Sequence, residues 1–249
     1  MIPKIIHFCW LSKDPYPLKI QHCLNSWRKH LPDYEIILWD SERFDISRSV
    51  WVKQAFDHRK YAFAADYIRF HALYHYGGIY LDADVEVLKR FDDLLHLPYF
   101  LGAEFAGTIE AAVIGAEKNC DWVKECLDYY EGRRFVKEDG SIDIRKLPEI
   151  MEEVIKRKRM VVKMSYNQTD DISREGMLKD LYLFPNYYFS PKIFDSRRVT
   201  LHPETYTIHH YQNSWFSGKA WAYYRFRAYL IRMMGYDVVR RVEKLILKR

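Results

Sequence analysis

The sequence predicts an α/β fold, because short apolar runs typical of buried strands alternate along the chain with segments of helical periodicity. Two nearly all-apolar runs at 2–11 and 34–40 enclose a helical pattern over 18–30. A strand, a helix and a strand in this order predict parallel pairing with a right-handed crossover. Parallel sheets bind ligands at the carboxyl ends of their strands, so ligand contacts are expected just after Phe8 and Leu38.

Length and composition limit the class of protein. The chain has 249 residues, of which 49% are hydrophobic and 29% charged, which fits a globular domain and argues against disordered, collagen-like and coiled-coil proteins. The apolar runs are far shorter than the roughly 20 residues of a membrane-spanning helix. The N-terminus lacks a signal-peptide pattern, and four cysteines without CxxC spacing fit a reducing compartment, so we expect a cytoplasmic protein.

The centre of the chain predicts a helix that leads directly into a strand. Apolar residues recur at helical spacing from 59 to 76, and a Gly-Gly pair at 77–78 predicts the helix end. Over 79–88, apolar and polar residues alternate, which predicts one extended strand with Asp82 and Asp84 on the same face. Two interpretations stay open here, a pair of carboxylates for one ligand and the solvated face of an antiparallel strand.

The second half of the chain predicts a strand–turn–strand unit at 99–119 and helices at 121–132 and 147–158. Short strands and loops with many aromatic residues are predicted at 181–191 and 204–216. Residues 133–180 are charged and mixed and carry no motif.

Asp66 and Arg69 lie three residues apart and therefore share one face of the predicted helix. Because that helix leads into the strand of Asp82 and Asp84, three carboxylates and one guanidinium are expected to converge. The alternative is a surface ion pair that stabilises by only about 0.3–0.5 kcal/mol. Spacing alone leaves both interpretations open.

Residue identity adds a resemblance. The stretch ADYIRFHALYHYGGIYLDADV at 65–85 closely resembles the DXD signature of glycosyltransferase family 32. KIIHFCW at 4–10 resembles the first strand of that family, and IHHYQNSW at 208–215 resembles its closing segment. The chain is more distantly similar to the large clostridial glucosylating toxins and to retaining galactosyltransferases of lipo-oligosaccharide synthesis. Three ordered segments make the resemblance far more specific than a lone DXD.

The resemblance implies a GT-A fold, a mixed sheet flanked by helices, together with a nucleotide-sugar donor and Mn²⁺ or Mg²⁺. A divalent ion held by carboxylates neutralises the charge that develops on a diphosphate leaving group. The implied metal ligands are Asp82, Asp84 and His209. His209 and His210 point to opposite sides of a strand, so only one of them is expected to ligate the metal.

The resemblance also implies a set of donor-binding residues, in which Trp10 stacks on the nucleobase and a loop closes over the diphosphate. For Trp10, packing in the core is the alternative. The implied catalytic residues are Asp66, Arg69, Asp82 and Asp84, and the implied donor-binding residues are Trp10, Asp66, Arg69, Tyr80, Asp82, Ser214 and Trp215. Glu104 and Glu110 are interpreted as surface residues, with contact to the acceptor as the alternative.

The implied reaction is metal-dependent transfer of a hexose from a nucleotide sugar, UDP-sugars being favoured, to a saccharide or lipid-linked glycan. Retention of anomeric configuration and a role in capsule, O-antigen or other surface polysaccharide synthesis also follow from the resemblance. Two alternatives remain open, a nucleotide-sugar hydrolase and an inactive nucleotide-binding module. No nucleic-acid partner is expected, because the main part of the chain is not basic.

The charge is concentrated at the C-terminus. Residues 219–249 carry a net charge of +7, and residues 1–218 carry −2. We therefore expect a catalytic domain over 1–218 and a basic amphipathic helical tail over 219–249, broken near Gly235. Peripheral contact with an anionic membrane such as the inner membrane surface is one interpretation of the tail. Packing of the tail on the catalytic domain is the other.

Overall fold

A central sheet organises the computed structural model, which describes residues 1–105, 107–165, 173–193 and 198–212 and parts of 226–242. Its strand order is β2-β1-β3-β6-β5. The first three strands are parallel and the last two run antiparallel to their neighbours. The bounds of these strands are β1 (Ile5–Cys9), β2 (Glu35–Trp39), β3 (Gly78–Leu81), β5 (Tyr99–Ala103) and β6 (Ile109–Ala116). The predicted α/β class with a mixed sheet is therefore confirmed.

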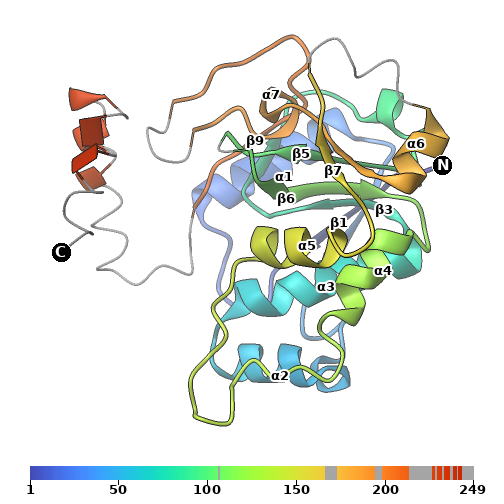
Figure 1. The fold of residues 1–249 in the computed structure, drawn as a ribbon, viewed down its shortest axis with the longest axis vertical. Helices are drawn as coiled ribbons and strands as arrows, with labels where there is room; N and C mark the ends of the chain where they lie inside the picture. Colours follow the sequence, from blue (N-terminus) through green and yellow to red (C-terminus); the bar gives the residue numbers. More distant parts are fainter. Residues whose placement is uncertain are drawn as a thin grey trace.

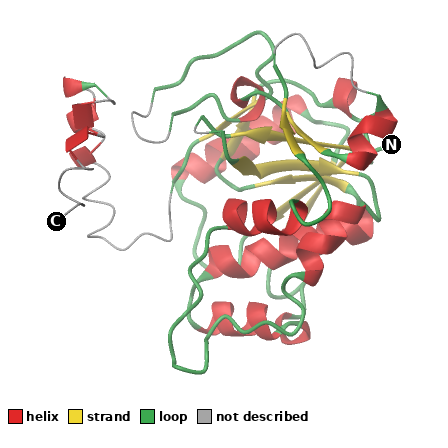
Figure 2. Cartoon of the chain, viewed as in Figure 1, coloured by secondary structure: helices red, strands yellow, loops and turns green. Residues whose placement is uncertain are grey.

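Helices cover both faces of this sheet (Figure 1, Figure 2). α1 (Leu18–His30) lies on one face, and α3 (Tyr61–Tyr76), α4 (Asp121–Asp128) and α5 (Leu147–Ile155) lie on the other. α2 (Val50–Asp57) packs on the outer side of α3. The smaller elements are η1 (Ile46–Arg48), β4 (Val85–Val87), η2 (Asp92–Leu94), β7 (Val161–Lys163), α6 (Arg174–Lys179), β8 (Leu181–Leu183), α7 (Asn186–Phe189) and β9 (Thr207–His209).

Alternation along β3 divides the core into two clusters. Ile79 and Leu81 pack on the side of α1, whereas Tyr80 packs on the side of α3. All four residues of β3 are buried, as expected for a strand in the middle of a covered sheet. Tyr80 therefore faces α3, and the same alternation directs Asp82, two positions later, to that side.

The prediction of one continuous strand over 79–88 is wrong. β3 ends at Leu81 and β4 begins at Val85, because the Val85 N–H donates to the Asp82 carbonyl over 2.9 Å and closes a turn. β4 then leaves the main sheet and pairs with β9. The two aspartates consequently lie in a turn and not on one face of a strand.

Most of the other predicted elements form with small shifts at their ends, but Asn186–Phe189, within the segment predicted as strands and loops, form the helix α7. The helix over 18–30 is confirmed with both bounds, and the central helix begins at Tyr61. α2 was missed, because its eight residues span too few turns to give a clear helical period. In the tail, Gly235 has a φ of +85° between helical residues, so the predicted break is confirmed. Within the described residues, no helix combines the length and the apolar character needed to cross a membrane.

The Gly-Gly turn between α3 and β3 requires glycine. Gly78 has a φ of +108°, and a Cβ atom there would lie 2.7 Å from the Ile5 carbonyl oxygen. His7 on β1 holds the same turn, because its Nε2 lies 2.8 Å from the Gly77 carbonyl oxygen. Trp39 donates to His7 Nδ1 over 3.1 Å, which leaves the hydrogen of a neutral imidazole on Nε2. The turn that delivers the chain to Asp82 is thus fixed to β1.

Replacing His7 by Gln is expected to weaken the pH dependence of stability. Burial lowers the pKa of His7 to about 4, so below pH 6.5 the unfolded chain binds a proton that the folded protein does not. Through this group, the free energy of unfolding falls by about 2 kcal/mol between pH 7 and pH 5. His7→Gln should lack that loss in urea denaturation at the two pH values, and His96→Gln, at an exposed histidine, is the control. An unchanged pH dependence in His7→Gln would contradict this assignment.

Candidate functional site

Asp66 and Arg69, three residues apart on α3, form an ion pair inside the protein. Their side chains are 11% and 6% exposed, and Arg69 Nη2 lies 3.0 Å from Asp66 Oδ1. The alternative of a surface pair is therefore wrong. The same Nη2 lies 3.3 Å from Asp82 Oδ1, so one guanidinium joins a carboxylate on α3 to one that follows β3.

Further contacts fix the direction of the Arg69 guanidinium. Nη1 donates to the main-chain carbonyl of Ala111 on β6. The guanidinium carbon lies 4.5 Å from the centre of the Tyr80 ring. Tyr80 is buried, and its hydroxyl donates to Asp82 Oδ1 over 3.0 Å. Arg69 thereby connects α3, β3 and β6, and Tyr80 contributes to the site by holding Asp82.

Burial makes these carboxylates costly to ionise. Burial raises the pKa of Asp66 to about 7, opposed by Arg69 and reinforced by Asp82. Burial likewise raises the pKa of Asp82, although Arg69 and His209 act in the opposite direction. An additional positive charge beside them would lower both pKa values, so the site favours a cation.

Asp82, Asp84 and His209 form a cluster that can hold a metal ion. Each offers one ligand atom, and these atoms all lie within 4.8 Å of one another. Antiparallel pairing sets His209 on β9 opposite Val85 on β4, which brings the imidazole to the aspartate turn. His209 Nε2 lies 3.5 Å from Asp84 Oδ1. The alternative of a solvated strand face therefore does not describe this pair of aspartates.

The chain that follows β9 holds Asp84 in place. The Gln212 N–H donates to Asp84 Oδ2 over 2.7 Å, and the His210 N–H donates to the Asp84 carbonyl over 3.1 Å. Burial opposes ionisation of Asp84, but His209 and the Gln212 N–H outweigh it and lower the pKa to about 2. Asp84 is therefore a carboxylate at neutral pH, as a ligand for a hard divalent cation must be.

His209, and not His210, faces the aspartates. His210 Nε2 lies 2.7 Å from Glu86 Oε2, and His22 Nε2 lies 3.0 Å from the other oxygen of the same carboxylate. The two adjacent histidines thus point to opposite sides of β9, as side chains on a strand do.

Glu110 is a site residue whose contact with His209 the sequence does not predict. It is 2% exposed on β6, so its interpretation as a surface residue is wrong, and its Oε2 lies 3.4 Å from His209 Nδ1. The available signal is a single carboxylate in the otherwise apolar run of 109–116. Glu104 is half-buried in the loop after β5. Burial raises the pKa of Glu104 to about 7, reinforced by Glu110 and opposed by the Thr108 hydroxyl and His209.

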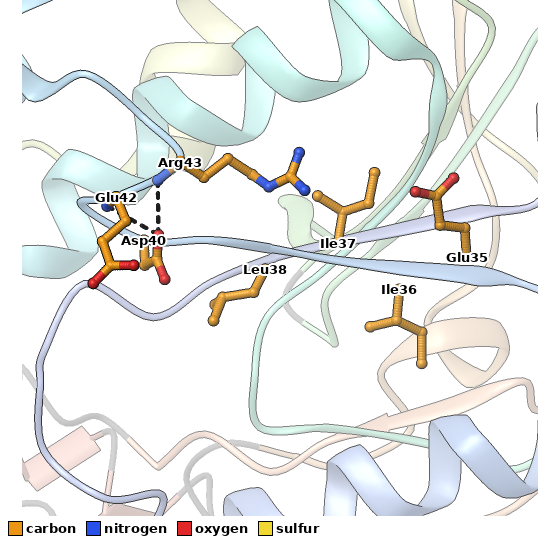
Figure 3. Close-up of a pocket in the computed structure, with 7 residues that line it drawn as sticks. All are labelled: Glu35, Ile36, Ile37, Leu38, Asp40, Glu42 and Arg43. Atoms are coloured by element: carbon orange, nitrogen blue, oxygen red, sulfur yellow. Dashed lines mark hydrogen bonds between the residues drawn. The ribbon is translucent and has the colours of Figure 1, made fainter.

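Trp10 lies at the carboxyl end of β1, beside a hollow of about 380 Å³ that it lines together with Leu38 and Asp40. A second hollow of about 450 Å³ follows the edge strand β2 and shares Leu38 and Asp40 with the first. Figure 3 shows Arg43 and Ile37 on one side of β2 and Leu38 on the other. The half-buried Trp10 donates its indole N–H to the Asp14 carbonyl over 3.0 Å. The hollow at Trp10 lies just after β1 and β2, where the sequence predicts ligand contacts, whereas the second is lined by β2 along its length.

Ser214 and Trp215 lie outside the residues that the structure describes. Their contact with the diphosphate therefore stays a prediction. The described part of the same segment ends at Gln212, next to Asp84.

Part of the chain, including several residues of this site, is similar to a known protein family. Residues 17–101 match the family described as "Glycosyltransferase sugar-binding region containing DXD motif". The matched segment includes Asp66, Arg69, Asp82 and Asp84, whereas Glu110 and His209 follow it in the chain.

Two yeast proteins are similar to part of the chain. "Inositol phosphoceramide mannosyltransferase 3" of Schizosaccharomyces pombe is 36% identical over 121 residues, which are 47% of this chain and 34% of that protein. "Mannosyl phosphorylinositol ceramide synthase SUR1" of Saccharomyces cerevisiae is 39% identical over 108 residues, which are 41% of this chain and 27% of that protein. The chain thus matches about a third or less of the length of these curated relatives.

Two solved structures are similar in part to this chain. "PaToxG Glycosyltransferase" is 19% identical with a TM-score of 0.47 and covers 63% of this chain and 69% of its own. The galactosyltransferase LgtC, in complex with donor and acceptor sugar analogs, is 14% identical with a TM-score of 0.42 and covers 90% of this chain and 95% of its own.

Replacing Arg69 by Met should lower the free energy of unfolding by about 3–5 kcal/mol, because it leaves buried carboxylates without their partner. Arg157→Met is the matched control, since the Arg157–Glu153 pair is 59% and 46% exposed. Its loss should cost less than about 1 kcal/mol. Urea denaturation at pH 7 measures both, and equal losses for the two variants would contradict the buried ion pair.

Proposed function

We propose that this chain, whose residues 17–101 carry the sugar-binding region of DXD-containing glycosyltransferases, transfers a hexose from a nucleoside diphosphate sugar to a saccharide acceptor. One observation carries the proposal. The cluster of Asp82, Asp84 and His209 lies directly beside the buried Asp66–Arg69 pair, so a cation site and a set of polar groups share one end of β3.

The donor atoms of the cluster fit a divalent cation. Carboxylate oxygens are the ligands that Mg²⁺ and Mn²⁺ prefer, and one imidazole favours Mn²⁺ over Mg²⁺. Asp82 and Asp84 would hold the ion from the turn between β3 and β4, and His209 would hold it from β9. Bound there, the ion supplies Lewis-acid stabilisation of the diphosphate leaving group.

The neighbouring residues would bind and orient the donor. Asp66 presents a carboxylate that can accept hydrogen bonds from sugar hydroxyls, and Arg69 keeps that carboxylate and Asp82 in place. Trp10 lines the hollow at the end of β1 and would stack on the nucleobase, a contact of about 1–3 kcal/mol. The nucleobase would then lie at the end of β1, and the sugar would lie beside Asp66 on α3.

The choice of donor sugar and acceptor rests on similarity to known proteins and not on the geometry of the site. UDP-sugars are the favoured donors by resemblance to family 32, and the names of the two yeast relatives add a mannosyl group to the choice of hexose. Retention of configuration and a role in surface polysaccharide synthesis belong to the same proposal.

We further propose that the basic segment 219–249 holds this otherwise cytoplasmic enzyme at an anionic membrane surface. The segment carries a net charge of +7, and its described residues Phe226, Tyr229 and Met233 are exposed. Basic and aromatic side chains together favour an anionic interface.

Sedimentation with vesicles tests the tail. The full chain should bind vesicles that contain phosphatidylserine at least about tenfold more strongly than neutral vesicles, because each Lys or Arg near the surface contributes about 1 kcal/mol. Deletion of 219–249 should remove the difference. Unchanged binding after the deletion would mean that the tail does not contact the membrane.

Thermal shifts test the donor site without an acceptor. We expect UDP or GDP, or one of their sugars, to raise Tm with Mn²⁺ and not with EDTA, because a ligand at 100 times its Kd stabilises by about 2.7 kcal/mol. The panel contains UDP, GDP, CMP, UDP-glucose, UDP-galactose and GDP-mannose. Asp84→Asn should lose the Mn²⁺-dependent shift and at least about a thousandfold in transfer rate, because it removes the charge of a metal ligand at constant shape.

Asp128→Asn is the control for this experiment, because Asp128 is an exposed carboxylate paired with Lys124 on α4. It should keep both the shift and the transfer. Transfer at the wild-type rate by Asp84→Asn in saturating Mn²⁺ would exclude the site. Donor cleavage that needs no acceptor would identify a hydrolase instead.

A further inference from the structure

Glu110 is a buried carboxylate with three hydrogen-bonding neighbours. Its Oε1 accepts from the Ala112 N–H over 2.8 Å. Its Oε2 lies 3.4 Å from His209 Nδ1 and 3.3 Å from the Tyr211 hydroxyl. A carboxylate at 2% exposure is tolerated only where such partners satisfy it. Glu110 therefore faces β9 with one oxygen and its own strand with the other.

The contact with Glu110 determines which nitrogen of His209 can bind a metal. An ionised carboxylate only accepts hydrogen bonds, so the hydrogen of the imidazole belongs on Nδ1, where it points to Glu110. Nε2 lies on the other side of the ring, 3.5 Å from Asp84 Oδ1. Nε2 is therefore the nitrogen that would bind a cation, because it faces the space shared with Asp82 and Asp84. In metal sites, a carboxylate behind the histidine commonly fixes the ring in this way.

Tyr211 restricts the same imidazole from its face. The two ring centres lie 4.0 Å apart with an angle of 37° between the planes. Tyr211 has a φ of +52°, which a residue with a side chain seldom adopts. Its hydroxyl lies 2.9 Å from Ser190 Oγ as well as beside Glu110. This unfavourable conformation packs the Tyr211 ring on His209 and directs the N–H of Gln212 to Asp84.

We propose that Glu110 is a positioning residue that fixes the tautomer and the orientation of His209 and thereby sets the affinity of the site for its divalent cation. The inference rests on the proposed function, because it concerns the ligand of that same cation site. The metal site would then depend on a residue of β6, which lies outside the segment that carries Asp82 and Asp84.

If Glu110 served only the structure of the strand, Glu110→Gln would not change the affinity for Mn²⁺. The pairing of β5 with β6 shifts between Leu101 and Gly102, and Glu110 satisfies the Ala112 N–H close to that irregularity. Glu110→Gln keeps this function, because the amide oxygen can accept from Ala112. The amide nitrogen then faces His209 Nδ1 and donates where the carboxylate accepted. The variant therefore preserves the strand and reverses the polarity presented to the ligand.

Titration with Mn²⁺, followed by the electron paramagnetic resonance signal of the free ion, tests the proposal on the full chain. Glu110→Gln should weaken Mn²⁺ binding about 10–100-fold. In a His209→Ala background the same substitution should cause no further loss, since its effect acts through that imidazole. Asp180→Asn is the control, because Asp180 is another buried carboxylate that accepts a main-chain N–H, from Met160. It should bind Mn²⁺ like the wild type.

Each outcome decides between the proposals. Equal affinity of Glu110→Gln and the wild type would overturn the positioning role alone, and so would an equal loss in the His209→Ala background. A wild-type protein that binds no Mn²⁺ would overturn the metal-dependent function and the inference with it. If Glu110→Gln does not fold, nitrogen NMR of His209 in the Mg²⁺-loaded wild type gives the answer. A hydrogen on Nδ1 supports the proposal, and a hydrogen on Nε2 overturns it.

Discussion

The buried contact of Arg69 with Asp66 and Asp82 is the interaction on which the candidate site depends. Three charged groups that are 6%, 11% and 29% exposed meet where α3, β3 and β6 come together. Without the guanidinium, burial would leave two carboxylates facing each other, at a cost of several kcal/mol. With it, one carboxylate is fixed on the helix and the other at the start of the turn that carries Asp84. The position of the turn therefore follows from a charge balance inside the protein.

That balance explains how distant parts of the chain build one site. The Gly-Gly turn and His7 fix the entry to β3, and the turn after Leu81 directs β4 away from the main sheet to pair with β9. Pairing with β9 brings His209 to the aspartates, and Glu110 on β6 contacts that histidine from behind. Negative charge then exceeds positive charge at the end of β3, which is the condition for binding a cation.

Much of this arrangement was predictable from local pattern. The spacing of Asp66 and Arg69 places them on one helix face, and the alternation of apolar runs with helical segments predicts a parallel opening to the sheet. The strand predicted over 79–88 is the exception. Alternation continues through Asp82 and Asp84, but a hydrogen bond from Val85 to Asp82 turns the chain there. Periodicity cannot detect such a turn, because the residues on both sides remain buried and apolar.

The sequence by itself determined the helix with Asp66 and Arg69, the glycine turn, the DXD pair and their order along the chain, since these are local properties set by spacing and backbone conformation. Only the tertiary structure decided that His209 and not His210 meets the aspartates, and that Glu110 is buried behind it. Both depend on pairing between segments that are about a hundred residues apart. No local pattern encodes such pairing, because it is selected by the packing of the whole sheet and by the need to satisfy buried charge.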